Sequence, residues 1–365
     1  MAISKKVLVA SVVLIIGSGC SSDKSKDSPA GVNDPPVITS ASTVEATGGI
    51  YFKYTALFSD PDGPAGTLAF SDYPPWLTAD GDSLFGTPPD GLTDTAFLVI
   101  VSDGVLADTL RVTIEMIPCL VVIGDTRTNH LIHQQLVDSI ETRRPLTVFH
   151  TGDLVSDGTL PDLWAMFNAI TAELRAMAEF FPALGNHEKQ SQLYFDNFVL
   201  PNNEQWYSVD RLNTHFIILN SCIQTDTLSE QYRWLKADLA AIPDSVVFTV
   251  VVFHHPPYST GRYTDDQLGL RQTWVPLFEQ YGVDVVFNGH DHHYERFYCG
   301  GIYYVVAAGG GAPLYDQTGQ HPCSQLFLMA YHYCKLSIIG GRMVVKVFGI
   351  DGQIIDQFDV LQPPL

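Results

Sequence analysis

The pattern of hydrophobic and polar positions divides most of the chain into two regions. In the first, residues 37–117, apolar side chains occur in short runs, such as residues 51–55 and 97–101. Clusters of Pro, Asp and Gly at 60–63 and 88–91 separate these runs. Short strands divided by turns of this kind predict a small all-β sandwich.

From residue 118 onward, the pattern changes to buried apolar strands that alternate with amphipathic helices. Such alternation indicates helices layered on sheets, as in α/β or α+β domains, and we expect an α+β domain over residues 118–365. The predicted helices are Leu131–Glu141, Asp162–Ala178, Glu230–Ala241 and Gln267–Gln280. The predicted strands are Leu120–Ile123, Leu146–His150, Phe181–Leu184, Phe216–Leu219, Val246–Phe253, Val283–Phe287, Ile302–Ala307, Tyr333–Ile339, Met343–Phe348 and Ile354–Val360.

A candidate export segment precedes both regions. Two lysines, the apolar run Val7–Ile16 and a few small residues have the layout of a secretory signal over residues 1–20, and the run is too short to span a bilayer. Its end resembles the bacterial lipobox, although Gly17 stands where leucine is usual, which implies a membrane anchor through lipidated Cys20. Residues 21–36 are polar and predict a flexible tether. We therefore expect an exported bacterial lipoprotein facing the periplasm or cell surface, with cleavage and release as the alternative.

Composition and charge exclude several classes of protein. A chain of 365 residues that is 46% hydrophobic can bury a sizeable core, which excludes a disordered chain. The 40 acidic and 20 basic residues give a net charge of −20. A negative field of this kind repels polyanions, so we expect no nucleic-acid groove.

The cysteines indicate one disulfide. Besides Cys20 the chain has five cysteines, and an odd number leaves at least one thiol unpaired. Exported proteins can form disulfides. We favour a pair between Cys299 and Cys323, because both flank one glycine-rich loop.

Five predicted strands run directly into short segments rich in Asp, Asn or His. Open α/β sheets bind ligands at the carboxyl ends of their strands, so we expect the five segments to converge on one crevice. Oxygen and imidazole donors suit transition metals, and a shared carboxylate can bridge two cations about 3.5–4 Å apart. No cysteine lies in the segments, which argues against a structural zinc site. The segments are Gly124–Arg127, Gly152–Asp157, Gly185–Glu188, His254–Tyr258 and Gly289–Arg296.

In this order the five segments resemble those of the calcineurin-like metallophosphoesterase superfamily, over about residues 118–360. Gly289–Arg296, His254–Tyr258 and the stretch from Tyr304–Val306 into Gly309–Leu314 are most similar to the purple acid phosphatase branch. The resemblance implies a four-layer αββα sandwich. It also implies a centre of two divalent or trivalent metal ions, of Fe, Mn or Zn.

Carried over by position, the resemblance implies a set of ligands with Asp153 as the bridge. The first metal would be held by Asp125, Asp153 and His292, and the second by Asp153, Asn186, His254 and His290.

The chain departs from the family pattern at two positions. Arg127 stands where many relatives have a metal-binding histidine, and a protonated guanidinium cannot be a ligand. Its planar fork suits a phosphate oxygen instead, with a surface salt bridge as the alternative. Ser156 stands where purple acid phosphatases have a metal-bound tyrosine, so we expect no purple colour.

The implied activity is hydrolysis of phosphate esters by a bridging hydroxide at the two-metal centre, with phosphomonoesters favoured. The catalytic residues would be Asp153, Arg127 and His187, and His187 would stabilise the phosphoryl group or protonate the leaving oxygen. The candidate residues of the substrate pocket are Arg127, His255, His293 and Tyr258.

Two other functions stay open. A phosphodiesterase or nucleotidase would use the same metal core and would differ in the residues that surround it. A catalytically silent surface-binding protein is the alternative from another class. Residues 37–117 resemble immunoglobulin- or cadherin-like modules of bacterial surface proteins, through Pro35–Ile38, Asp60–Gly63 and Val101–Gly104, and this would imply a glycan or surface partner.

Overall fold

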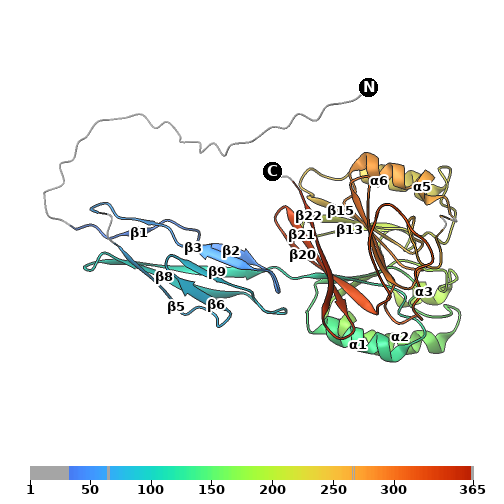
Figure 1. The fold of residues 1–365 in the computed structure, drawn as a ribbon, viewed down its shortest axis with the longest axis horizontal. Helices are drawn as coiled ribbons and strands as arrows, with labels where there is room; N and C mark the ends of the chain where they lie inside the picture. Colours follow the sequence, from blue (N-terminus) through green and yellow to red (C-terminus); the bar gives the residue numbers. More distant parts are fainter. Residues whose placement is uncertain (1–32, 64–65, 265, 267, 363–365) are drawn as a thin grey trace, which may run out of the picture.

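The computed structural model describes residues 33–63, 66–264, 266 and 268–362. Figure 1 shows two parts that follow one another along the chain: an elongated part made of strands, and a larger part in which helices cover strands. The predicted signal and Cys20 lie outside the described residues. Within these residues, no helix is both long and apolar enough to cross a membrane.

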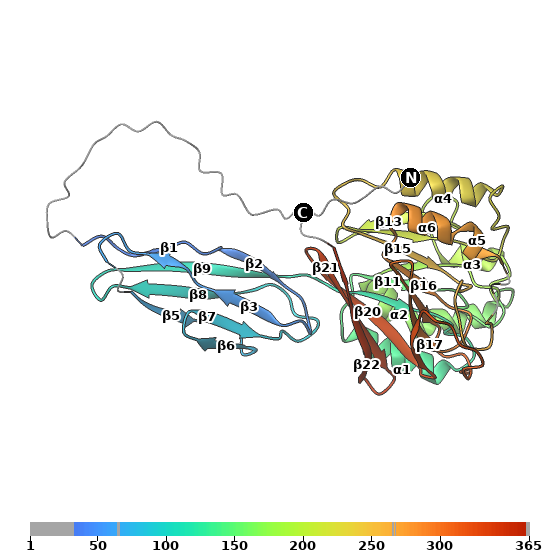
Figure 2. The same ribbon diagram turned by 45° about the horizontal axis from the view of Figure 1, so that its top comes forward.

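The N-terminal part consists of strands in three sheets. The strands are β1 (Val37–Ile38), β2 (Thr43–Ala46), β3 (Phe52–Thr55), β4 (Phe58–Ser59), β5 (Thr67–Ser71), β6 (Leu77–Asp80), β7 (Ser83–Gly86), β8 (Thr95–Ser102) and β9 (Ala107–Met116). One sheet has the order β2-β9-β8-β5 and another the order β3-β7-β6, while β1 pairs with β4 (Figure 2). Phe52 and Leu84 of one sheet meet Phe97 and Val112 of the other in a shared apolar core. The immunoglobulin- or cadherin-like resemblance stays a prediction.

The C-terminal part contains two mixed sheets. The first has the order β12-β11-β10-β20-β21-β22, with β10 (Leu120–Ile123), β11 (Thr147–His150), β12 (Glu179–Pro182), β20 (His332–Ile339), β21 (Arg342–Gly349) and β22 (Ile354–Leu361). The second has the order β13-β14-β15-β16-β18-β17-β19, with β13 (Tyr207–Arg211), β14 (Thr214–Ile218), β15 (Phe248–Phe253), β16 (Val285–Asn288), β17 (Tyr294–Cys299), β18 (Ile302–Ala307) and β19 (Ser324–Leu328). The three neighbours β10, β11 and β12 are parallel, and so are β14, β15, β16 and β18.

Helices cover the outer faces of both sheets. They are α1 (His130–Glu141), α2 (Pro161–Met177), α3 (Gln192–Asn197), α4 (Glu230–Ala240), α5 (Leu270–Thr273) and α6 (Val275–Tyr281). Apolar clusters join α1 and α2 to the first sheet and α4, α5 and α6 to the second, on opposite sides in Figure 1. A third cluster lies between the sheets, where Phe149 stacks on Phe216 with ring centroids 4.1 Å apart. These are the four layers that the resemblance implies.

Some elements differ from the prediction. The single helix expected over Gln267–Gln280 is divided into α5 and α6, because Pro276 has no amide hydrogen to donate to the preceding turn. The strand expected at Phe181–Leu184 is shifted to Glu179–Pro182, where it pairs residue by residue with β11. Strands β13, β17 and β19 were not expected.

The structure confirms the disulfide between Cys299 and Cys323. It connects the end of β17 to the residue before β19, and so closes the loop that contains β18 and the glycine-rich segment. Of the other described cysteines, Cys119, Cys222 and Cys334 are free.

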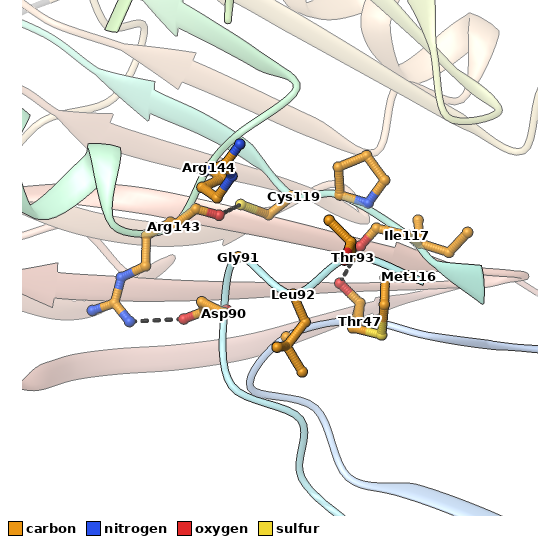
Figure 3. Close-up of a pocket in the computed structure, with 12 residues that line it drawn as sticks. Thr47, Asp90, Gly91, Leu92, Thr93, Met116, Ile117, Cys119, Arg143 and Arg144 are labelled. Carbon is orange, nitrogen blue, oxygen red and sulfur yellow. Dashed lines mark hydrogen bonds and ion pairs between the residues drawn. The ribbon is translucent and has the colours of Figure 1, made fainter. Parts of the chain in front are cut away.

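A cluster of charges around Asp90 joins the two parts of the chain. Asp90 Oδ2 accepts a hydrogen bond from Arg143 Nη1 at 2.7 Å, and Asp90 Oδ1 pairs with Lys335 Nζ. The Lys335 side chain, on β20, is 1% exposed, and its Nζ also donates to the carbonyl oxygen of Gly48 at 2.8 Å. The pair of Asp90 with Arg143 borders a cavity of about 100 Å³ between the two parts (Figure 3). A buried ammonium needs a counter-ion, so Asp90 attaches the N-terminal strands to the first sheet.

We expect Asp90→Ala to lower the free energy of unfolding by about 3 kcal/mol, because it leaves the Lys335 ammonium buried without its partner. Urea denaturation followed by circular dichroism measures this loss. Adding Lys335→Met should restore most of it, since no buried charge then remains. Asp80→Ala, at an exposed position of the N-terminal part, is the control. Equal urea midpoints for the two alanine variants would contradict the assignment.

Candidate metal centre

The sheet topology brings the five polar segments to one place. Asp125, Asp153 and Asn186 follow the parallel strands β10, β11 and β12, while His254 and His290 follow the parallel strands β15 and β16. Parallel strands have their carboxyl ends on the same side of a sheet. The two sets of loops touch, since the amide of His290 donates to Asp125 Oδ2 at 3.0 Å. Residues from all five segments therefore lie together.

The backbone of these loops is tightly constrained. Gly152 has a φ of +98°, and a Cβ there would lie 2.7 Å from a backbone nitrogen of the neighbouring loop. A Cβ at Gly289 would lie 2.5 Å from Asp125 Oδ2. Asp125, Asp153 and His290 themselves have φ values of 56°, 57° and 69°. Non-glycine residues held in this region are costly and concentrate at functional sites.

Four atoms that could bind a metal ion form what we call the Asn186 group, which consists of Asp153 Oδ1, Asn186 Oδ1, His254 Nε2 and His290 Nδ1. Asn186 Oδ1 lies 3.0 Å from both His254 Nε2 and His290 Nδ1, and His254 Nε2 lies 3.3 Å from Asp153 Oδ1. The Nδ1 of His254 is 3.0 Å from the carbonyl oxygen of Thr151, which orients the ring so that Nε2 faces the group. Two imidazoles, an amide oxygen and a carboxylate oxygen at this spacing fit a transition-metal cation.

A second set of donors, which we call the Asp125 group, lies beside the first. It consists of Asp125, Asp153 and His292, each of which offers one ligand atom, and these atoms all lie within 4.8 Å of one another. Arg127 reaches into this group, because its Nε donates to Asp153 Oδ2 at 3.1 Å and its Nη2 lies 3.1 Å from His292 Nε2. The Arg127 side chain is 14% exposed. It faces Asp153 and His292, and its ion pair with Asp153 is internal to the centre.

Burial sets the protonation state of the candidate imidazole ligands. It lowers the pKa of His254 well below its usual value, that of His290 to about 2 and that of His292 to about 4. The three rings are therefore neutral at pH 7 and each keeps a lone pair, which is the state that binds metals.

Two buried carboxylates lie next to one another in the centre. Asp125 is 0% exposed and Asp153 is 1% exposed. Burial, and then the charge of Asp153, raise the pKa of Asp125 well above its usual value, while Arg127 acts in the opposite direction. The pair therefore needs positive charge close by.

Glu188 connects the loops of two candidate ligands, a role that the sequence did not predict. Its Oε2 accepts hydrogen bonds from the amides of Asp153 at 2.9 Å and Gly185 at 2.7 Å, and its Oε1 accepts one from the amide of Leu154 at 2.9 Å. Burial, and then Asp153, raise its pKa to about 8, and the amide donors oppose this. Glu188 thus fixes the loop of Asp153 against that of Asn186. The one sequence feature that could have indicated this role is its position in the polar segment Gly185–Glu188.

His187 has one ring nitrogen fixed and the other directed at the centre. Its Nδ1 lies 2.7 Å from the carbonyl oxygen of Ser156, and its Nε2 lies 3.8 Å from Asp153 Oδ2. The side chain is 30% exposed, so the ring is accessible. Ser156 therefore contributes its backbone at the position where purple acid phosphatases have a tyrosine.

A cavity of about 430 Å³ opens beside the Asn186 group. Its lining includes Asn186, Ser221, Cys222 and His255. The Nδ1 of His255 is 2.8 Å from Ser221 Oγ, which holds the ring at the cavity wall. Among the predicted pocket residues, His255 therefore lies beside the centre.

Two other predicted pocket residues lie elsewhere. His293 is 0% exposed, with its Nε2 3.2 Å from Glu295 Oε2, so burial corrects the prediction that it lines the substrate pocket. Tyr258 packs on Tyr304 with ring centroids 4.8 Å apart, in the apolar cluster beneath α5 and α6. Neither residue lines the cavity beside Asn186.

Two tyrosines that the sequence did not single out cover candidate ligands. Tyr315 stacks on His292 with ring centroids 4.2 Å apart, and Tyr263 lies 4.4 Å from the ring of His290. Both come from loops whose path depends on the tertiary fold, and no motif marks them.

Comparisons with known proteins agree with this geometry. Residues 120–294 match the family described as Calcineurin-like phosphoesterase. Purple acid phosphatase 15 of Arabidopsis thaliana is 33% identical over 172 residues, which are 40% of this chain and 32% of that protein. Purple acid phosphatase 22 of the same plant is 28% identical over 220 residues, which are 52% of this chain and 51% of that protein. The chain thus spans between about a third and a half of the length of these relatives.

A solved structure shares the fold. The purple acid phosphatase from yellow lupin (Lupinus luteus) seeds aligns with a TM-score of 0.61 and 17% sequence identity, over 85% of this chain and 69% of that one. At this identity the likeness concerns the fold alone. The C-terminal part of the chain is thus similar in sequence to the calcineurin-like phosphoesterases, over residues 120–294, and in fold to a purple acid phosphatase.

Proposed function

We propose that this protein hydrolyses phosphate esters at a metal centre, with phosphomonoesters as substrates. The observation that carries the proposal is the Asn186 group, in which Asn186, His254 and His290 meet Asp153 with donor atoms 3.0–3.3 Å apart. The names of the relatives, which are purple acid phosphatases, support a phosphatase in particular.

The two donor groups differ in how well they fit a cation. The Asn186 group fits, because its four donors are close together and two of them are neutral imidazoles. The family suggests a dimetal centre, but the Asp125 group contains the Arg127 guanidinium and does not fit a cation in the same way. The Asn186 group would hold a cation whose chemistry, when it is bound, is to lower the pKa of a coordinated water and to supply positive charge for the phosphate.

Side chains of the protein supply the other requirements of the reaction. Arg127 presents a guanidinium fork that can bind non-bridging phosphate oxygens. His187 donates its Nδ1–H to the Ser156 carbonyl oxygen, so the ring, when it is protonated on both nitrogens, can pass its Nε2 proton to the leaving oxygen. The cavity of about 430 Å³ beside Asn186 has room for the alcohol part of the ester.

We expect the purified protein to hydrolyse p-nitrophenyl phosphate faster than its bis ester, measured by the absorbance of released p-nitrophenolate. A chelator should remove this activity, and added Zn²⁺, Mn²⁺ or Fe²⁺ should restore it, because the water is activated by metal. Faster hydrolysis of the bis ester would favour the phosphodiesterase alternative. No metal-dependent turnover of either ester would favour the silent surface-binding protein.

Two substitutions test the assigned roles. Asp153→Asn should abolish turnover, because it removes the charge shared by both groups. His187→Ala should lower kcat by about 10²- to 10⁴-fold, the usual contribution of a general acid, while bound metal is unchanged. His215→Asn, at the amino end of β14, is the control and should keep normal kinetics. Wild-type kcat in His187→Ala would remove this residue from the mechanism.

Glu188→Gln should weaken metal binding by about 10- to 100-fold, because it disturbs the loops of Asp153 and Asn186 without removing a ligand. Calorimetric titration with Zn²⁺ measures the affinity directly. The same change at the exposed Glu173 of α2 is the matched control. An unchanged Zn²⁺ affinity in Glu188→Gln would show that the loops are positioned without this carboxylate.

A further inference from the structure

The Arg127 guanidinium lies where the family pattern would put the first cation. Its Nε–H donates to Asp153 Oδ2 at 3.1 Å. Its Nη2 lies 3.1 Å from His292 Nε2. Two of the three residues of the Asp125 group therefore already bind one organic cation.

The second of these contacts uses the lone pair that a metal would need. His292 Nδ1 lies 2.8 Å from the carbonyl oxygen of Pro313, which can only accept, so the proton of the neutral ring is on Nδ1. Nε2 then carries the lone pair and accepts the Nη2–H of Arg127. Tyr315 stacks on the ring and holds it in this orientation.

Charge also favours this arrangement. Asp125 and Asp153 are both buried, and the guanidinium of Arg127 donates to Asp153 at 3.1 Å. Because the Arg127 side chain is 14% exposed, it is held inside the centre and not on the surface. A metal ion placed beside it would meet a fixed positive charge and would have to displace its two hydrogen bonds.

The Asn186 group has no such competitor. The structure gives its donor atoms Asp153 Oδ1, Asn186 Oδ1, His254 Nε2 and His290 Nδ1 no hydrogen bond from a described lysine or arginine. One carboxylate, Asp153, thus separates a group open to a cation from a group filled by a guanidinium.

We propose that Arg127 replaces the first metal ion, so that the centre binds one transition-metal cation in the Asn186 group and uses the guanidinium as a permanent positive charge in the Asp125 group. The proposal rests on the proposed function only in taking the Asn186 group as a metal site. It gives this protein a mixed centre, in which a cation held by the Asn186 group and the Arg127 guanidinium would both supply positive charge around Asp153.

Metal content tests this directly. After incubation with excess Mn²⁺ and desalting, elemental analysis should find one manganese per chain in the wild type and two in Arg127→His, which replaces the cation by a donor. The electron paramagnetic resonance spectrum should change from that of an isolated Mn²⁺ ion to that of an exchange-coupled pair. Arg262→His, at the guanidinium 4.9 Å above Tyr315, is the matched control and should keep one ion.

The outcomes separate this inference from the proposed function. Two ions per chain in the wild type, or none, would overturn the inference, whether or not esters are hydrolysed. A protein with one ion, a second in Arg127→His and no phosphatase activity would support the inference and end the proposed function.

If circular dichroism shows that Arg127→His is poorly folded, a second pair of variants tests the inference. Asn186→Ala should lose the single ion, and Asp125→Asn should keep it, because Asp125 belongs to the group without metal. Equal loss of manganese in both variants would overturn the inference.

Discussion

The carboxylate of Asp153 is the contact around which the C-terminal part is organised. It is 1% exposed, and its two oxygens face different groups of donors. A buried anion of this kind must be compensated by hydrogen bonds and positive charge, or it destabilises the fold. Three contacts hold Asp153 in place. Its backbone amide donates to Glu188, and its side chain accepts from the guanidinium of Arg127. Gly152, which has no Cβ, lets the neighbouring loop approach closely.

Much of the C-terminal part could be predicted from the sequence, because an apolar run that ends in Asp, Asn or His indicates both a buried strand and the position of its carboxyl end. The strand ends at Ile123, His150 and Phe253 coincide with the predicted ones. Parallel pairing then brings the ligand candidates of each sheet together, and the packing of the two sheets brings the two sets into contact. The disulfide could also be predicted from the sequence, because Cys299 and Cys323 flank one glycine-rich loop.

The sequence was less informative where contacts between loops decide the outcome. His293 adjoins a candidate ligand, yet Glu295 pairs with it inside the fold and removes it from solvent. Tyr315 and Tyr263 cover ligand rings from loops that carry no motif. Arg127 could be recognised as a departure from a family pattern, but its hydrogen bonds to residues far along the chain required the three-dimensional arrangement.

The ring closed by Cys299 and Cys323 carries both groups that hold His292, namely the carbonyl oxygen of Pro313 and the aromatic face of Tyr315. Reduction of the disulfide frees the ends of that ring and weakens the restraint on both groups. The order of the candidate metal centre is therefore linked to the redox potential of the surroundings, and oxidising conditions favour the geometry described above.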